Sequence, residues 1–209
     1  MVRQILRLAL FALAIFHSTA ASAVNINVVW TSEVGQFAPL WVTKEAKLFE
    51  KYGNNVELIF IQGASLAAAA LTSGDAQVGM FSPQVVISNP GLELVMFGRL
   101  GNTMDNRIYA RKGIKSIKEV KRVAISRFGS NADFAARFLL QREGLRPDID
   151  VALLQVGNQV NRIAAVETHN ADAAMLTPPM TLQARKLGMT LLLDASKLNI
   201  PYSSLMFVS

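Results

Sequence analysis

Residues 126–133, Ser-Arg-Phe-Gly-Ser-Asn-Ala-Asp, combine several features that favour binding of an anion. Ser130 and Asp133 have the spacing of a capping box, which predicts that a helix begins at Ser130. The first N–H groups of a helix lack partners within the helix, and its dipole favours negative charge there. Gly129 leaves room for close approach, and Arg127 adds a cation. The alternative, that Ser130 only caps the helix and Arg127 lies on the surface, stays open.

Small and polar residues also gather in other segments that are expected to follow strands. Ligands of open α/β sheets bind beyond the carboxyl ends of the strands, so these junctions are candidate ligand contacts. Ser65 is predicted to cap an alanine-rich helix, and Ser82 and Thr177 each precede a proline that suits a first helical turn. Their hydroxyls suit a structural role as well as a ligand. The segments are residues 31–39, 62–65, 82–83, 157–159 and 177–179.

The sequence offers little for catalysis. Beyond residue 23 it contains one histidine, His169, which is expected at the end of a helix, and it has no cysteine. Neither a Gly-x-Ser-x-Gly elbow nor a Gly-x-x-x-x-Gly-Lys phosphate loop is present. Of the carboxylates near the junctions, Glu33 and Asp133, the second is expected to serve in capping. We therefore predict a protein that is not an enzyme and uses no cofactor or metal.

Apolar runs of strand length alternate with helical patterns along the whole chain, which predicts an α/β fold with largely parallel sheets. Gly53, Gly74, Gly144 and Gly188 each follow a helical run, as residues that end helices do. The first set comprises strands at 26–30, 56–61, 78–81 and 94–97 and helices at 37–52, 65–73 and 83–89. The second set comprises strands at 122–125, 151–156, 173–176 and 190–193 and helices at 130–143, 160–168 and 179–187.

The two sets of elements repeat one another. A shift of 95 positions places residues 28–97 on residues 123–192 without a gap, and Met-Phe-Ser-Pro then matches Met-Leu-Thr-Pro. Such a repeat is the size of a lobe rather than of a solenoid unit. Although any two βαβα segments can be aligned in this way, the length of this match favours two similar lobes.

The first 23 residues have the pattern of a secretory signal peptide. Arg3 and Arg7 precede an apolar run, residues 8–16, which is too short to cross a membrane, and cleavage is predicted after Ala23. The expected divisions are a signal peptide at 1–23, lobe 1 at 24–106, a hinge crossing at 107–111, lobe 2 at 112–202 and a return crossing to lobe 1 at 203–209.

Bulk properties narrow the class of protein further. The 209 residues are 51% hydrophobic and 17% charged, which is enough to bury a core. Without cysteine there is no disulfide and no site for a lipid anchor, so the exported protein is expected free in the periplasm. The net charge of +6 falls to +4 without Arg3 and Arg7. Basic residues interleave with acidic ones, which disfavours nucleic acid and fits either a small anionic ligand or a mixed solvated surface.

The sequence resembles periplasmic substrate-binding proteins of the nitrate/sulfonate/taurine class of ABC importers, which share their fold with thiamine-pyrimidine-synthesis proteins. The resemblance covers almost all of the chain after residue 23. It depends on residues 37–53 (Phe-Ala-Pro-Leu-Trp to Tyr-Gly), the turn at 73–76, residues 125–130 (Ile-Ser-Arg-Phe-Gly-Ser), and residues 176–182 with 186–188.

This resemblance implies a monomeric protein of the type II periplasmic binding protein fold, with hinge strands between its lobes. The lobes would close around a small, anionic ligand, and the closed form would dock on an inner-membrane ABC permease. It also implies that ligand contacts come from the strand-to-helix junctions, with Phe37 and Phe128 as candidates for stacking on a ring. The expected ligand-binding residues are Ser32, Gln36, Phe37, Gly63, Ala64, Ser65, Ser82, Arg127, Phe128, Gly129, Ser130, Asn131, Asn158, Thr177 and Pro178.

Members of this class continue well beyond the return crossing, so the sequence is expected to be a C-terminally truncated form that lacks the rest of lobe 1. Apolar surface exposed in this way predicts low solubility or stability. Two other functions remain open. An enzyme like the thiamine-pyrimidine synthases would rely on histidine and cysteine chemistry, which this chain hardly offers. The second open function is an exported module that binds a ligand and reports it to a membrane receptor.

Overall fold

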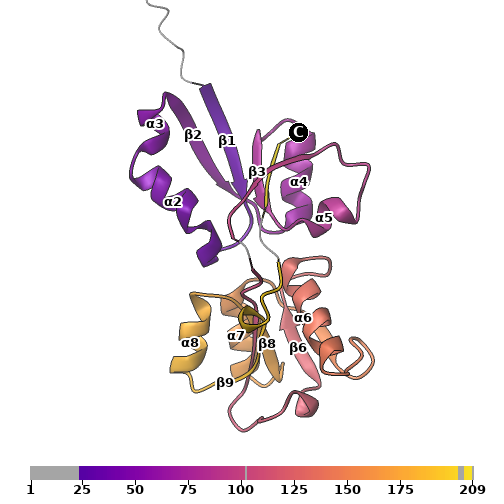
Figure 1. Ribbon diagram of the computed structural model, residues 1–209. Coiled ribbons are helices and arrows are strands. Elements are labelled where there is room, and N and C mark those ends of the chain that lie inside the picture. Colours follow the sequence, from indigo (N-terminus) through magenta and orange to yellow (C-terminus); the bar gives the residue numbers. More distant parts are fainter. Residues whose placement is uncertain (1–23, 102, 202–204, 209) are drawn as a thin grey trace, which may run out of the picture.

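The computed structural model of the protein describes residues 24–101, 103–201 and 205–208. The predicted signal peptide, residues 1–23, lies outside these residues, as do residue 202, at the predicted end of lobe 2, and residues 203, 204 and 209 of the predicted return crossing. The described chain forms two α/β lobes, each built around a five-stranded sheet (Figure 1). Its described helices include none that is long and apolar enough to cross a membrane.

The first sheet has the strand order β2-β1-β3-β10-β4. β1 pairs in parallel with both β2 and β3, whereas β10 runs antiparallel between β3 and β4. The predicted strands at 26–30, 56–61, 78–81 and 94–97 all form, with ends that differ by a few residues. The strands are β1 (Val24–Trp30), β2 (Asn54–Phe60), β3 (Val78–Phe81), β4 (Val95–Arg99) and β10 (Leu205–Val208).

Helices cover both faces of this sheet (Figure 1). On one face α4 and α5 pack through Ala67, Leu71 and Val85 against Phe81. The opposite face is covered by η1 and α2, where Phe37 and Leu40 join a cluster with the strand side chains. The helical segments are η1 (Gly35–Phe37), α2 (Ala38–Glu45), α3 (Leu48–Lys51), α4 (Ala64–Thr72) and α5 (Gln84–Ile87).

The second sheet has the strand order β7-β6-β8-β5-β9, in which β5 is the antiparallel strand. α6 covers one face, and α7 and α8 cover the other. Its strands are β5 (Arg107–Ala110), β6 (Arg122–Ile125), β7 (Ala152–Gln155), β8 (Ala173–Leu176) and β9 (Thr190–Asp194). Its helical segments are η2 (Ile117–Glu119), α6 (Asn131–Arg142), α7 (Gln159–Glu167), α8 (Met180–Lys186) and η3 (Ala195–Lys197).

The internal repeat reappears in the pairing registers. Val28 lies opposite Val78 in the first sheet, and the residues 95 positions later, Val123 and Ala173, are partners in the second. Each antiparallel strand also carries a register shift against the edge strand at the corresponding place, between Met206 and Phe207 in β10 and between Ile108 and Tyr109 in β5. The two lobes therefore share one plan, as the repeat predicts.

Each antiparallel strand belongs to the other lobe than the strand that precedes it in the sequence. β5 follows β4 of the first sheet yet lies inside the second sheet, and β10 follows β9 of the second sheet yet lies inside the first. Residues 107–111, predicted as a crossing, are therefore mostly strand β5. The connection between the sheets lies earlier, between Arg99 and Arg107.

Two local predictions fail and one is confirmed. The helix predicted at 37–52 is interrupted at Lys47, whose φ of 54° is left-handed, so α2 and α3 are separate. Ser65 is not a cap, because α4 begins at Ala64 after Gly63. The predicted helix ends are confirmed by positive φ at four glycines: Gly53 (77°), Gly74 (83°), Gly144 (76°) and Gly188 (72°).

Candidate functional site

A cleft of about 280 Å³ lies between the two lobes and is lined by strand-to-helix junctions of both. The lobes meet directly beside it, since the Gly35 N–H donates to the Pro178 carbonyl oxygen at 3.0 Å. Gln36 also reaches from the first lobe to Asp105 in the connection between the sheets, and its Nε2 donates to Asp105 Oδ1 at 3.0 Å. The cleft is thus built from three separate parts of the chain.

Most of the residues predicted to contact a ligand line this one cleft. The junctions of both sheets therefore converge, as expected for the carboxyl ends of parallel strands. The predicted residues that line it are Ser32, Gln36, Gly63, Ala64, Ser65, Ser82, Arg127, Phe128, Gly129, Ser130, Asn131, Asn158 and Thr177.

Phe37 and Pro178 are the exceptions. Phe37 is only 1% exposed and packs edge-on against Trp30, with ring centroids 6.4 Å apart, so it belongs to the core of the first lobe. Pro178 contributes its carbonyl oxygen to the contact between lobes. Of the two rings considered for stacking, only Phe128 lines the cleft, and it is 53% exposed.

The helix start at Ser130 forms as the capping box predicts. Ser130 Oγ accepts from the Asp133 N–H at 3.3 Å, and Asp133 Oδ2 accepts from the Gly129 N–H at 2.8 Å. Asp133 is held in turn by Arg137 Nε at 2.8 Å. Because the protein's own carboxylate occupies the Gly129 N–H, this helix start is a weaker anion site than its sequence suggests.

Arg127 is exposed and lies at the boundary between the lobes. Its side chain passes 3.6 Å from the position that a Cβ would take at Gly63, on the opposite wall. Gln62 of the first lobe makes a similar approach, with Nε2 3.6 Å from the position of a Cβ at Gly157. At these two places a long polar side chain of one lobe lies next to a glycine of the other.

The cation most enclosed in the cleft is Arg162, which sequence reasoning missed. It lies on α7 and is only 7% exposed. Its Nη1 donates to the Met175 carbonyl oxygen, but Nε has no hydrogen-bond partner. Burial lowers its pKa to about 10, and no ion pair to it is found among the described residues. A buried cation without a counter-ion costs several kcal/mol, which a bound anion would offset.

A sequence signal for Arg162 did exist. Gln159, Arg162, Ile163 and Val166 follow the spacing of the buried face of a helix. An arginine there, where an apolar residue is expected, rarely occurs without a partner. Arg162 is therefore a charged residue on a helix face whose spacing marks it as buried.

Three further buried polar atoms in the cleft lack a hydrogen-bond partner: Asn106 Oδ1, Asn131 Oδ1 and Thr177 Oγ1. Buried polar groups in folded proteins are nearly always hydrogen-bonded to protein or water. With Arg162 Nε they make a group of unpartnered donors and acceptors in one small space, which is the composition of a polar binding site.

The charged side chains of the cleft balance one another. Arg127 and Glu33 are exposed, whereas Arg162 is buried and Asp105 is half-buried. Burial raises the pKa of Asp105 above its ordinary value, and the hydrogen bond from Gln36 and the nearby Arg107 only partly oppose this. The cleft therefore has one negative and one positive side chain in its interior, Asp105 and Arg162, and one of each sign at its surface, Glu33 and Arg127.

The described residues include no group of three or more His, Cys, Asp or Glu side chains that could hold a metal ion. His169 lies just beyond α7 with a left-handed φ of 60°, where the other lobe has Gly74. It is a helix-end residue, as predicted.

Comparison with known proteins gives a consistent picture of the fold. A family model described as NMT1/THI5 like matches residues 34–209, and a search of curated proteins gave no match. Among solved structures, the periplasmic aliphatic sulphonate binding protein SsuA from Escherichia coli is 20% identical, with a TM-score of 0.72. The alkanesulfonate-binding protein SsuA from Xanthomonas axonopodis pv. citri, bound to MOPS, is 19% identical with a TM-score of 0.73.

The periplasmic nitrate-binding protein NrtA from Synechocystis PCC 6803 is also 19% identical, with a TM-score of 0.73. These matches cover 90%, 91% and 89% of the present chain in turn, but only 62%, 67% and 56% of the three solved chains. The likeness is therefore one of fold over almost the whole sequence, to proteins that are considerably longer.

Proposed function

Because the chain belongs to the NMT1/THI5-like family, we propose that it is the solute-binding component of an ABC-type importer. It closes its two lobes around a small anionic ligand, such as a sulfonate or nitrate, and delivers it to an inner-membrane permease. The solved sulphonate-, alkanesulfonate- and nitrate-binding proteins of the same fold support this class of function.

The observation that carries the proposal is Arg162 in the cleft between the lobes. It is a buried guanidinium whose Nε has no partner, and it lies beside other unpartnered polar atoms. A ligand anion would supply the missing charge and hydrogen bonds at once. The predicted ligand contacts from both lobes surround the same space, so a ligand there favours the closed arrangement of the lobes.

The location and division of the protein follow from the same proposal. The pattern at 1–23 would direct export and be removed, which leaves the protein free in the periplasm, as a monomer at low concentration. Lobe 1 then consists of the first sheet with β10, lobe 2 of the second sheet with β5, and the hinge lies in the connections between them. The Met104 N–H donates to the Ile200 carbonyl oxygen at 2.9 Å, which links these two connections.

Isothermal titration calorimetry on the chain without residues 1–23 tests the proposal. Nitrate, ethanesulfonate, 2-hydroxyethanesulfonate, 2-aminoethanesulfonate and sulfate form the panel. We expect one bound molecule per chain for at least one organic sulfonate or nitrate, at a dissociation constant below about 100 μM, or roughly −5.5 kcal/mol. A cooperatively folded protein that binds none of these compounds would contradict the proposed function.

A further inference from the structure

We infer that the ligand has two different ends, an anionic group held by Arg162 and a hydrogen-bond donor, such as an amino or hydroxyl group, held by Asp105. This inference rests on the proposed function and specifies the ligand of the same cleft. Among the charged side chains that line the cleft, Arg162 and Asp105 are the least exposed, and they have opposite signs.

A simple anion would satisfy only half of this arrangement. Arg162 attracts it, but Asp105 lies in the same cavity of about 280 Å³ and repels it. Charge interactions over a few ångströms are strong where water is largely excluded. A ligand that also presents a donor turns this repulsion into a charge-assisted hydrogen bond, and such bonds are about twice as strong as neutral ones.

Asp105 is fixed in place as a binding group must be. Gln36 Nε2 donates to its Oδ1 at 3.0 Å, and Arg107 Nη1 donates to its backbone carbonyl oxygen at 3.2 Å. Burial raises the pKa of this carboxyl group, so its environment lacks the solvation that an ionised carboxylate needs. A hydrogen-bond donor on the ligand would replace the missing water at this carboxylate.

The next residue adds a second acceptor beside the first. Asn106 is 2% exposed, lines the cleft, and its Oδ1 has no partner. Two acceptors thus lie side by side on the connection between the sheets, whereas Arg162 lies on α7 of the second lobe, where Asn131 Oδ1 and Thr177 Oγ1 are also unpartnered. The direction of the bound molecule is therefore set by the two opposite charges, Asp105 on the connection and Arg162 on α7.

Three ethanesulfonates that differ only at the second carbon test this inference by calorimetry. They carry an amino group, a hydroxyl group or a hydrogen there. We expect the amino and hydroxyl compounds to bind the wild-type chain about tenfold or more tightly than ethanesulfonate, as one hydrogen bond to a charged group requires. This comparison needs no variant, so it does not depend on how any substitution folds.

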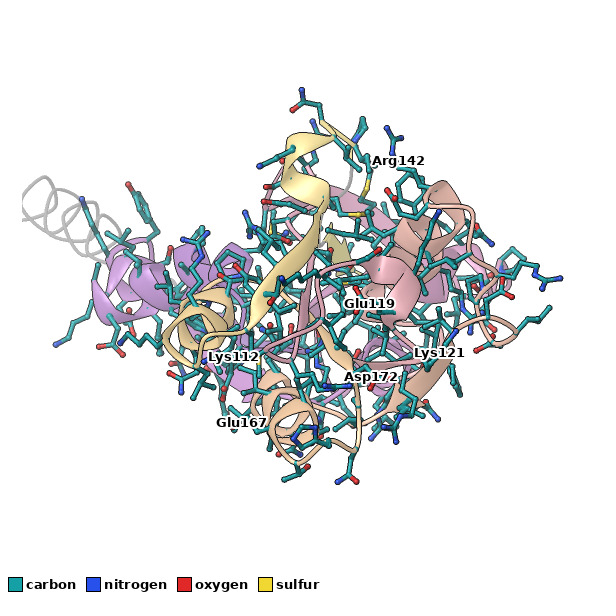
Figure 2. The ribbon with its side chains drawn as sticks, turned by 90° about the horizontal axis from the view of Figure 1, so that it is seen from below. Lys112, Glu119, Lys121, Arg142, Glu167 and Asp172 are labelled. Atoms are coloured by element: carbon teal, nitrogen blue, oxygen red, sulfur yellow. The ribbon has the colours of Figure 1, made fainter. Side chains whose placement is uncertain are left out.

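Variants then assign the two ends. In Asp105→Asn the preference for the amino compound over ethanesulfonate should fall about tenfold, because the carboxylate charge is lost. In Arg162→Met all three compounds should lose most of their affinity, whereas Arg162→Lys should retain part of it. Glu167→Gln is the matched control, since Glu167, labelled in Figure 2, is an exposed acid at the last position of α7 and does not line the cleft.

The possible failures are distinguishable. Equal affinity of the wild-type chain for the three compounds, or an unchanged preference in Asp105→Asn, would refute the two-ended ligand and leave the proposed binding function standing. Binding of nitrate alone would do the same. Absence of binding by every compound, with a cooperative thermal unfolding transition, would refute the proposed function together with the inference.

Discussion

At the scale of single residues, the two arginines that line the cleft differ in their burial. Arg127 belongs to the segment that the sequence marks most clearly, yet it is exposed and lies along the opposite wall. Arg162 carries no motif, yet it is buried and its Nε lacks a partner. A cation away from water interacts more strongly with a bound anion than an exposed one does. We therefore rank Arg162 above Arg127 as the charge that holds the ligand.

This ranking predicts different effects for two equivalent substitutions. Arg162→Met should weaken binding of the tightest sulfonate by about a hundredfold, as loss of a buried charge-assisted contact implies. Arg127→Met should weaken it by about tenfold or less, because that guanidinium is solvated. Calorimetry on both variants measures the two losses of affinity, and thermal unfolding curves confirm that both variants fold. Complete loss in Arg127→Met alone would restore Arg127 as the principal contact.

We expect the Asp105 carboxylate to lower the stability of the folded protein while it contributes to ligand binding. Its pKa is raised above the ordinary value of 3.8, chiefly by burial. The folded state therefore takes up the proton more readily than the unfolded state, and the ionised group costs stability at neutral pH. Asp105→Asn should raise the unfolding midpoint at pH 7, and the gain should shrink as the pH falls through the raised pKa towards 3.8.

Thermal unfolding of both proteins between pH 4 and pH 8 measures this difference, and comparing them cancels the titration of other groups. Glu167→Gln provides the control, because that acid is exposed. A midpoint for Asp105→Asn below that of the wild type throughout this range would show that the carboxylate is stabilising.

How far the site is readable from the sequence also depends on individual residues. The cap at Ser130 and the place of His169 at the end of a helix follow from local rules and are confirmed. Asp105 and Asn106 lie in an irregular polar run between two sheets, and nothing local shows that the run faces a cleft. Their position is decided by pairing of β5 with strands more than 60 residues further along the chain.

At the scale of elements, the repeat extends to equivalent hydrogen bonds. The Asn27 N–H donates to Gln77 Oε1 at 2.8 Å, and the matching pair in the second lobe, the Arg122 N–H and Asp172 Oδ2, are 3.0 Å apart. Strands and helices were largely predictable because their periodicity is local. The break at Lys47 was not, because residues 37–52 contain no glycine and their one proline lies near the start.

The start of α4 gives a prediction at this scale. Gly63 has a φ of +107° and lies 3.6 Å from the Arg127 side chain. Gly63→Ala should therefore destabilise the protein by about 1–2 kcal/mol through backbone strain, whereas ligand affinity should change little, because an added Cβ would lie at an ordinary van der Waals distance from Arg127. Chemical denaturation and calorimetry measure the two effects.

Gly91→Ala is the matched control for this change. No heavy atom lies within 4 Å of the position of a Cβ at Gly91, and its φ is not left-handed. It should leave both stability and affinity nearly unchanged. Equal stability of the two variants would show that the left-handed backbone at Gly63 imposes no requirement for glycine.

At the scale of the whole molecule, each lobe is completed by a strand that the chain supplies after building the other. This arrangement links the two sheets twice and places Asp105 and Asn106 in one of the links. A short extended run such as Arg107–Ala110 does not reveal which sheet it joins. For this reason the sequence predicted a crossing where the structure has an interior strand.

The two lobes differ in how well their edge strands are covered. In β9 of the second lobe Leu191, Leu192 and Leu193 pack against its two clusters. In β4, at the edge of the first sheet, Met96 (56%) and Phe97 (55%) correspond to Leu191 and Leu192 and are more than half exposed, as is the neighbouring Val95 (62%). An exposed apolar edge strand is a template for pairing with another chain.

We therefore expect the chain to self-associate through β4 as its concentration rises. A double substitution, Val95→Lys with Phe97→Lys, should reduce this association, because charged side chains block edge-to-edge pairing. Ile149→Lys, at an exposed apolar residue of the second lobe that lies outside any sheet, is the control and should not reduce it. Sedimentation velocity at several concentrations measures the distribution of species. A wild-type chain that stays monomeric, or association equally reduced by Ile149→Lys, would show that β4 is not the surface through which the chain associates.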